Sequence, residues 1–206
     1  MTLLIGIAGR MRTGKSTLAT LLAQKLEEYG GVGVQICINS FAEALRQEIS
    51  EMIWSNVDSA SARYLLSVHE EEHKESIRPL LQAWGQAKRD IIHMDYWVDA
   101  LSKAVRRRGC DFTIIDDVRH SNEADYILRN GGILIRLRAN TDVLYDRGAK
   151  PDRLEHYSEN AMSRPSQEEM RKPYRVLTLD TSGMSPLGMI KAIWPFVEEM
   201  VGGEEE

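Results

Sequence analysis

Short apolar runs and longer stretches with helical periodicity alternate along this chain. Five runs are mostly apolar and rich in branched residues, as is typical of β-strands; they cover residues 3–8, 32–38, 112–115, 133–137 and 176–179. Their apolar character is continuous and does not alternate with polar positions. This pattern predicts strands that are buried on both faces, as in a parallel sheet covered by helices.

The stretches between the apolar runs predict helices. Leu18, Leu21, Leu22 and Leu26 recur at helical spacing after the first run, and the helix should end near the Gly30-Gly31 pair. Residues 41–108 show helical patterns and no clear strand signal. We therefore expect an α/β fold with a helical insertion between the second and third strands. Such an insertion can overhang the carboxyl ends of the strands, where ligands bind.

Composition and charge indicate the number of domains and limit the kinds of binding partner. The 206 residues, 43% of them hydrophobic, suffice for a single domain with one core. A net charge of −5 argues against a nucleic-acid polymer or an anionic membrane as the main partner. Cys37 and Cys110 are the two cysteines, and each lies in or beside an apolar run. We expect two reduced, buried thiols, which favour the cytosol.

Residues 9–16 fit the phosphate-binding pattern G-x-x-x-x-G-K-[ST], between a predicted strand and a predicted helix. The glycines let backbone amides approach phosphates at the positive end of the helix. Lys15 would reach the β- and γ-phosphates of ATP, and the Ser16 hydroxyl would bind Mg²⁺. The alternative is a glycine-rich turn before an ordinary helix. The candidate nucleotide-binding residues in the loop are Gly9, Arg10, Thr13, Gly14, Lys15, Ser16 and Thr17.

A second candidate site follows the third apolar run, which ends in Asp116, Asp117 and Arg119. One carboxylate could hold Mg²⁺ or its waters, and Arg119 could grip a phosphate through its planar guanidinium group. We favour Asp117 and Arg119 for these roles. The alternative is a capped strand-to-helix turn that contains an Asp–Arg pair.

Amide and guanidinium groups lie among aromatic residues in the insertion. A nucleobase needs a stacking surface and hydrogen bonds to its edge, and this mixture can supply both. Aromatic residues at helical spacing are also typical of an ordinary core, and that alternative stays open. The candidate residues are Arg78, Gln82, Trp84, Gly85, Gln86, Tyr96 and Trp97.

A basic segment follows the fourth apolar run, within a predicted lid at about residues 139–164. Arginines on a mobile lid would close over the triphosphate and stabilise the transferring phosphoryl group, whereas solvated surface arginines are the alternative. The basic and polar residues are Arg138, Arg147, Lys150, Arg153, His156 and Glu159, of which Arg147 and Arg153 are the catalytic candidates. Thr181, after the fifth run, either passes beneath an adenine or belongs to a simple turn.

Two further motifs are given structural interpretations. Residues 69–73 match the zinc-binding pattern H-E-x-x-H, but their neighbours are heavily acidic and no clear third ligand follows. The arginines at positions 106–108 precede Gly109, and cations in a last helical turn complement the helix dipole. Neither motif therefore predicts a separate function.

With these residues in view, the sequence resembles the bacteriophage deoxynucleoside monophosphate kinases, within the P-loop nucleoside monophosphate kinase group. The resemblance spans nearly the whole chain and rests on GRMRTGKST, INSFAEALR, RPLLQAWG, YWVDAL, IIDDVRHSNEAD and HYSE. It implies a five-stranded parallel sheet in the order 2-3-1-4-5, with ATP, Mg²⁺ and a dNMP as ligands. It also implies the cytoplasm of an infected cell, and it leaves homodimer formation open.

The resemblance assigns acceptor-binding roles to several residues of this chain. They are Phe41, Arg78, Gln82, Gly85, Trp97, Asp117, Arg119 and Glu123. A member of that family has Asp at the position of Ser16, so the resemblance does not identify the Mg²⁺ ligand. Two rival functions are another P-loop small-molecule kinase, acting on a cofactor precursor or a sugar, and a nucleotide-dependent regulatory ATPase.

Overall fold

The computed structural model describes residues 2–56, 71–155 and 164–202. They form two compact units, one from residues 1–40 and 104–206 and one from residues 41–103. The expectation of a single kinase domain over residues 1–206, with an insertion at 41–108 and a lid, stays a prediction.

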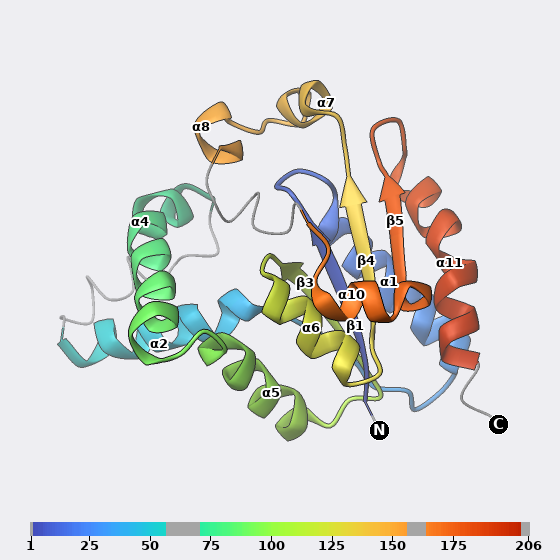
Figure 1. Ribbon diagram of the computed structural model, residues 1–206, viewed down its shortest axis with the longest axis horizontal. Coiled ribbons are helices and arrows are strands. Elements are labelled where there is room, and N and C mark those ends of the chain that lie inside the picture. The colour runs from blue at the N-terminus through green and yellow to red at the C-terminus, as the bar shows by residue number, and fades with distance from the viewer. Residues whose placement is uncertain (1, 57–70, 156–163, 203–206) are drawn as a thin grey trace. The chain divides into compact units, whose positions relative to one another are not determined.

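The first unit contains a five-stranded parallel sheet in the order β2-β3-β1-β4-β5 (Figure 1). Its strands are β1 (Leu3–Gly9), β2 (Ile36–Asn39), β3 (Phe112–Val118), β4 (Ile133–Arg138) and β5 (Val176–Asp180). The expected fold class and the expected strand order are both confirmed.

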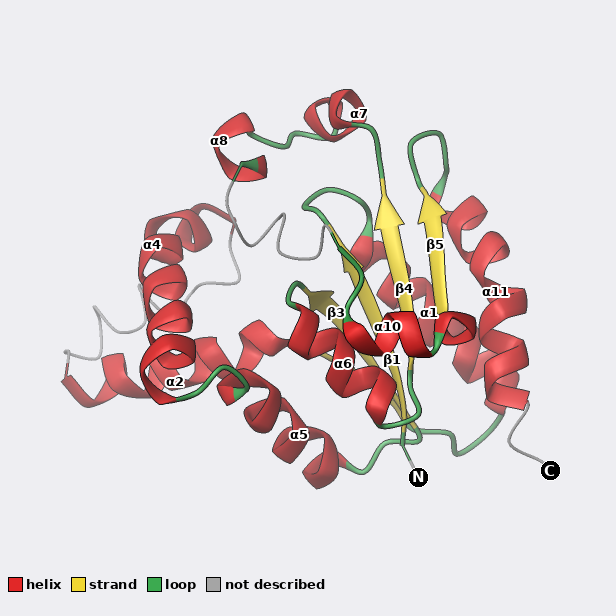
Figure 2. Ribbon diagram, in the orientation of Figure 1, coloured by secondary structure: helices red, strands yellow, loops and turns green. Residues whose placement is uncertain are grey.

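Helices cover both faces of this sheet (Figure 2). On one side lie α1 (Lys15–Gly30) and α11 (Pro186–Gly202), and on the other lie α6 (Ser121–Arg129) and α10 (Gln167–Arg171). The described part of the unit also contains the end of α5 (Tyr96–Arg108) and three short helical segments: α7 (Thr141–Asp146), α8 (Pro151–Leu154) and the 3-10 turn η2 (Pro173–Arg175). This three-layer arrangement explains why the strands are apolar on both faces.

One core cluster of the first unit lies between the sheet and the α1–α11 layer. It joins Ile5, Ile7, Ile114, Ile133 and Ile135 of the strands to Leu18, Leu22 and Leu26 of α1 and to Ile193 and Val197 of α11. All of these side chains are fully buried. The leucine periodicity noted in the sequence therefore marks the sheet-facing side of α1.

The second strand is shorter than the sequence predicts. The apolar run begins at Val32, but β2 begins at Ile36. Gly31 and Gly33 adopt φ angles of 72° and 101° in the intervening turn, and Val32 projects fully into solvent. Positive φ angles at these glycines turn the chain before it can join the sheet.

The described residues of the second unit form helices joined by a short turn at residues 93–95, as expected of a helical insertion. It contains α2 (Phe41–Asn56), α4 (Glu71–Ala87), the π-helical turn η1 (Lys88–Ile92) and the first part of α5 (Tyr96–Arg108). Ile49 and Ile53 of α2 form a small core with Leu45, Leu81 and Trp84. None of the described helices is long and apolar enough to cross a membrane.

The cysteines correct one expectation. Cys37 of β2 and Cys110, two residues before the start of β3, form a disulfide across 73 positions of sequence. The expectation of two reduced thiols is therefore wrong, and the cysteines give no support to a cytosolic location. Strands β2 and β3 are neighbours in the sheet, and Cys37 lies in register with Thr113, so the pairing of the strands brings the two sulfurs together.

Candidate nucleotide site

The loop between β1 and α1 has the backbone shape that phosphate binding requires. Gly9, Arg12 and Gly14 adopt positive φ angles of 152°, 61° and 96°. A Cβ atom at Gly9 would lie 2.6 Å from the carbonyl oxygen of Leu137 and 2.8 Å from the Thr13 hydroxyl. Position 9 therefore accepts only glycine, and the sequence motif corresponds to a real constraint on the backbone.

Lys15 opens α1 and turns back into the loop. Its ammonium group donates to the carbonyl oxygens of Gly9 and Arg10, each at 2.8 Å, and the residue is only 9% exposed. A phosphate in the loop would compete with these carbonyls for the ammonium protons. Lys15 is thus a buried cation with its charge directed at the expected anion site.

Two buried threonines, Thr13 and Thr181, stabilise the loop through hydrogen bonds. The Thr13 hydroxyl donates to the Arg10 carbonyl at 2.8 Å. Thr181, which follows β5 and is 0% exposed, lies 3.1 Å from the carbonyl oxygens of both Thr13 and Arg138. These contacts hold the loop to the ends of β4 and β5. The observed contacts of Thr181 are therefore structural, and a contact with adenine stays a prediction.

Ser16 identifies which of the two aspartates faces the loop. Its hydroxyl donates to Oδ2 of Asp116 at 2.8 Å. Asp117 is the next residue of β3, but the pairing with β1 shifts here, from Gly6 opposite Ile115 to Ala8 opposite Val118, so the usual alternation of side chains is interrupted at these two aspartates. The sequence analysis favoured Asp117 as a metal ligand, but the structure brings Asp116 to Ser16.

The pair of Ser16 and Asp116 fits a magnesium ion by its chemistry. Both side chains offer oxygen atoms, and Mg²⁺ in such sites keeps several waters and binds one or two carboxylates together with substrate phosphates. In the part of the chain that the structure describes, no group of three or more His, Cys, Asp or Glu residues could hold a metal ion by itself. A magnesium ion here would therefore share its coordination with the nucleotide.

A cavity of about 400 Å³ opens beside the loop. Polar atoms of the loop line one part of it, and Met184, Pro186 and Met189 add an apolar wall. The full lining consists of Arg12, Thr13, Gly14, Lys15, Ser16, Thr17, Arg147, Met184, Pro186 and Met189. An anionic group at the loop and a flat apolar group against the methionines would both find complementary surfaces.

Arg147 also lines this cavity. Its guanidinium group donates to the Thr181 carbonyl at 2.6 Å and to the Arg12 carbonyl at 3.3 Å. It therefore connects the phosphate loop to the turn after β5. Its catalytic role as a lid arginine stays a prediction.

The phosphate loop also contacts the segment predicted to be a lid. The Arg10 guanidinium donates to the Leu154 carbonyl at 3.0 Å, and Met11 packs on a small core of Leu144, Ala149 and Leu154. The sequence analysis missed this use of Arg10 and Met11, because both occupy variable positions of the motif. Arg138 and Lys150 are exposed. The Arg153 side chain and residues 156–163, including His156 and Glu159, lie outside the described part.

The turn after β3 is a capped helix start. Glu123 is 2% exposed, and its Oε2 atom accepts hydrogen bonds from the backbone amides of Arg119 and His120 at 2.7 and 3.0 Å. This is the capping alternative considered from the sequence. The Asp117 and Arg119 side chains are half-buried. Acceptor-binding roles for these three residues stay predictions.

In the second unit, the predicted acceptor residues make internal contacts. The Trp97 indole is 2% exposed and donates to the Gly85 carbonyl at 3.0 Å. A Cβ atom at Gly85 would lie 3.3 Å from Leu45, so glycine permits the close approach of α2 and α4. Phe41 is also buried. These positions match the alternative of an ordinary core, whereas Gln82 is exposed and Arg78 is half-buried.

The sequence analysis missed a polar cluster in this unit. Glu48 accepts hydrogen bonds from Trp84 Nε1 at 3.1 Å and Tyr96 OH at 3.0 Å, and it pairs with the Lys88 ammonium. The ammonium lies 5.1 Å from the Trp84 ring centre and 4.8 Å from that of Tyr96. These bonds lower the pKa of Glu48 although desolvation by burial opposes them, and the bond to Glu48 raises the pKa of Lys88. Glu48 and Lys88 belong to no motif that a sequence would reveal.

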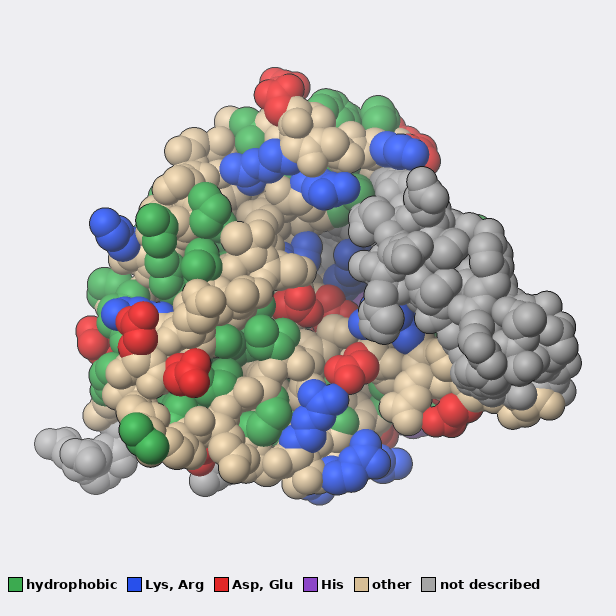
Figure 3. Space-filling view, turned by 180° about the vertical axis from the view of Figure 1, so that it is seen from behind, with side chains coloured by type: hydrophobic (Ala, Val, Ile, Leu, Met, Phe, Trp, Pro, Cys, Tyr) green, Lys and Arg blue, Asp and Glu red, His purple; other side chains and the backbone are tan. Residues whose placement is uncertain are grey.

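Two signals set aside in the sequence analysis receive no new support. Residues 69 and 70 of the H-E-x-x-H segment, and the side chain at position 73, lie outside the described part. Arg106, Arg107 and Arg108 form the last turn of α5 before Gly109, whose φ angle is 64°. On the face that Figure 3 shows, the described basic side chains are interspersed with acidic ones.

Comparisons with known proteins agree with this geometry. A family model described as an AAA domain matches residues 5–163. A sugar kinase from Janibacter sp. HTCC2649 superposes with a TM-score of 0.54 at 13% identity, over 96% of this chain and 95% of that chain. Shikimate kinase from Aquifex aeolicus gives 0.50 at 14% identity, over 98% and 99%.

A thymidylate kinase from Candida albicans gives a TM-score of 0.49 at 15% identity, over 98% of this chain and 94% of that chain, which is too low to carry an argument. No protein of curated function matches the sequence significantly. At these identities the structural similarity establishes the fold and leaves the substrate undefined.

Proposed function

Because this chain belongs to the AAA domain family and has the fold of P-loop kinases, we propose that it transfers the γ-phosphate of ATP to a deoxynucleoside 5′-monophosphate. One observation carries the donor half of this proposal. The buried Lys15 ammonium and the paired Ser16 and Asp116 side chains meet at one glycine-shaped loop. This arrangement suits a nucleoside triphosphate bound with a magnesium ion.

Lys15, Ser16, Asp116 and the backbone amides of the loop each have a proposed role in this reaction. Lys15 exchanges its carbonyl partners for phosphate oxygens and offsets the charge that develops on them. Ser16 and Asp116 would hold Mg²⁺, which neutralises phosphate charge when it is bound. The backbone amides at the start of α1 orient the phosphates. Transfer is direct and in line, with no covalent enzyme intermediate, because phosphoryl transfer depends on positioning and charge stabilisation.

The acceptor half of the proposal rests on the sequence. The segments RPLLQAWG and YWVDAL in the insertion and DDVR after β3 resemble those of phage deoxynucleoside monophosphate kinases. Arg78 and the exposed Gln82 supply the charge and the amide that a nucleotide requires. Phage origin and deoxynucleotide metabolism belong to the same proposal.

One observation favours a second candidate, a kinase for a small acceptor without a base. The Trp97 indole is buried and hydrogen-bonded to Gly85, and Trp84 is engaged with Glu48. The Trp97 ring is therefore no stacking surface for a nucleobase, and the half-buried Trp84 ring has the Lys88 ammonium 5.1 Å from its centre. The fold is equally compatible with such a kinase.

An acceptor panel separates these functions. ADP release would be measured in a coupled assay with ATP, Mg²⁺ and, in turn, each dNMP, each NMP, sugars and shikimate. We expect at least one dNMP to raise turnover well above the rate without acceptor. Stimulation by a sugar or another base-free acceptor alone would replace the proposal with the second candidate. Hydrolysis that no acceptor changes would point to a regulatory ATPase.

A further inference from the structure

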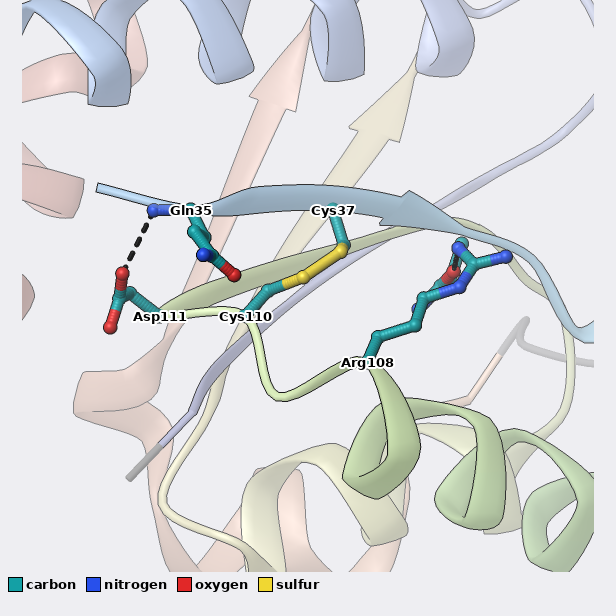
Figure 4. Close-up of a disulfide and its surroundings, with 6 residues drawn as sticks. Gln35, Cys37, Arg108, Cys110 and Asp111 are labelled. Carbon is teal, nitrogen blue, oxygen red and sulfur yellow. Dashed lines mark hydrogen bonds between the residues drawn. A yellow bond between two sulfur atoms is a disulfide. The ribbon is translucent and has the colours of Figure 1, made fainter. Parts of the chain in front are cut away.

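The disulfide closes the chain around the whole second unit. Cys37 precedes the point where the chain enters residues 41–103, and Cys110 follows the point where it leaves them. Figure 4 shows the bond bridging β2 and the segment between α5 and β3. We propose that the Cys37–Cys110 disulfide is a redox-controlled clasp on the two segments that carry the second unit, and that a dithiol opens it.

A clasp matters here because β2 is weakly held. The strand is an edge of the sheet, has four residues and pairs with β3 alone. Three of its four residues are partly or largely exposed, including Ile38 at 42%. Short edge elements with few buried contacts open locally at low free energy. A covalent link across a long loop restricts that opening.

The other bonds at this place can be replaced by water. The Gln35 amide donates to the exposed Asp111 carboxylate at 2.8 Å (Figure 4), and the Phe112 amide donates to the Gln35 carbonyl at 3.1 Å. Arg108 donates to the Asn39 side chain. All three bonds can exchange with solvent when the strand opens, whereas the disulfide persists until a reductant arrives.

The chemistry of opening is thiol–disulfide exchange. Cys37 is half-buried and Cys110 is 5% exposed, so a dithiol thiolate attacks the Cys37 sulfur and Cys110 leaves as a thiolate. The second thiol of the reagent then displaces Cys37 and closes a cyclic disulfide. Two electrons and two protons pass from the dithiol to the protein, which ends with two thiols.

The first test uses the wild-type chain purified without reductant. Thiols titrated in denaturant should number zero before treatment with dithiothreitol and two after it. Hydrogen exchange should then accelerate in peptides that cover 34–40 and 104–112 and stay unchanged in the loop at 9–17. The double variant Cys37→Ser/Cys110→Ser should show the hydrogen exchange of the reduced wild type, and dithiothreitol should not change it. Two thiols before treatment, or equal exchange in both states, would overturn the clasp.

A second readout rests on the proposed kinase function. If the second unit carries the acceptor site, reduction should raise the KM for the acceptor at least about threefold and leave the KM for ATP unchanged. If reduction accelerates hydrogen exchange at 34–40 but the chain phosphorylates no acceptor, the clasp is supported and the proposed kinase function is contradicted. If the chain is an active kinase but hydrogen exchange at 34–40 is the same in both redox states, the kinase function is supported and the clasp is contradicted.

Discussion

At the scale of single residues, Lys15 carries the largest share of the proposed chemistry. Its ammonium group is directed into the loop by two backbone carbonyls. We expect Lys15→Met to lower kcat at least about a hundredfold, the usual loss when one preorganised charge contact disappears from a transition state. The measurement is the steady-state rate of ADP release at saturating ATP with an acceptor that the panel identifies.

The matched control is Lys191→Met, which removes an exposed lysine of α11 that does not line the cavity. Its kcat should equal that of the wild type. Thermal unfolding of both variants shows whether the loop still folds. Near-normal turnover of a folded Lys15→Met variant would contradict the donor half of the proposal.

The two aspartates of β3 provide a sharper comparison. Asp116 accepts a hydrogen bond from the Ser16 hydroxyl, and Asp117 is the neighbouring carboxylate of the same strand. We expect Asp116→Asn to raise the Mg²⁺ concentration for half-maximal activity roughly tenfold or more, the scale seen when a partner of a metal ligand is lost. Asp117→Asn should leave this concentration unchanged. Magnesium titrations of the rate decide the matter, and a larger effect at Asp117 would restore the assignment made from sequence.

The same pair shows where sequence reasoning stops at this scale. The motif from Gly9 to Ser16 identifies its own residues, because each glycine and the lysine answer a backbone or charge requirement. The adjacent Asp116 and Asp117 satisfy the same pattern equally well. Which one meets Ser16 depends on the local register of β3, which shifts at these two residues, and the sequence pattern does not show that shift.

At the scale of elements, the Glu48 cluster joins α2, α4, η1 and α5. Desolvation raises the pKa of the Glu48 carboxyl, but bonds from Lys88, Tyr96 and Trp84 outweigh it and lower the pKa below 4.5. A depressed pKa contributes stability above the unfolded value, and this contribution is lost as pH falls through the folded value. Lys88 has a raised pKa, so its contribution is present below 10.5 and is lost as pH rises further.

We therefore expect the wild type to lose more stability than Glu48→Gln when the pH falls from about 6 to about 3. Urea unfolding followed by tryptophan fluorescence gives the free energy of unfolding at each pH. The difference between the two proteins isolates Glu48 from the other carboxyl groups. Parallel curves for the two proteins would mean that the cluster is not formed in solution.

Elements also differ in how well the sequence reveals them. The strands β1, β3, β4 and β5 begin where the apolar runs begin, because buried strands need continuous apolar residues. The start of β2 differs from the prediction because Gly31 and Gly33 form a turn inside an apolar-looking run. A hydrophobicity pattern contains no information about the φ angle of a glycine. The predicted start of β2 therefore lies too early, at Val32 instead of Ile36.

At the scale of the whole molecule, the order of the strands determines the pairing of the cysteines, which the composition did not predict. The two cysteines were expected to be free because they are few and lie in apolar runs. The order β2-β3-β1-β4-β5 puts β2 beside β3, and this adjacency brings Cys37 to Cys110 across 73 positions. The strand order implied by the family resemblance already places β2 beside β3 and so brings the two cysteines close together. The general rule that few cysteines indicate reduced thiols takes no account of strand order.

The proposed reaction also assigns different ligands to the two units. The phosphate loop and its cavity belong entirely to the first unit, and Arg78, Gln82 and Trp97 belong to the second. We expect a nonhydrolysable ATP analogue to slow hydrogen exchange in peptides at 9–17 and 181–189. A stimulating dNMP should slow exchange at 78–97, because ligands stabilise the segments that they contact.

Exchange followed by mass spectrometry, with each ligand alone and with both together, measures this division. The Lys15→Met variant supplies the control, because it should weaken protection by the ATP analogue and keep protection by the monophosphate. Protection of 9–17 by the monophosphate alone would mean that the acceptor occupies the donor loop. Protection confined to 9–17 and 181–189 with every ligand would remove the second unit from nucleotide binding and leave a first unit that binds ATP without a nucleotide acceptor.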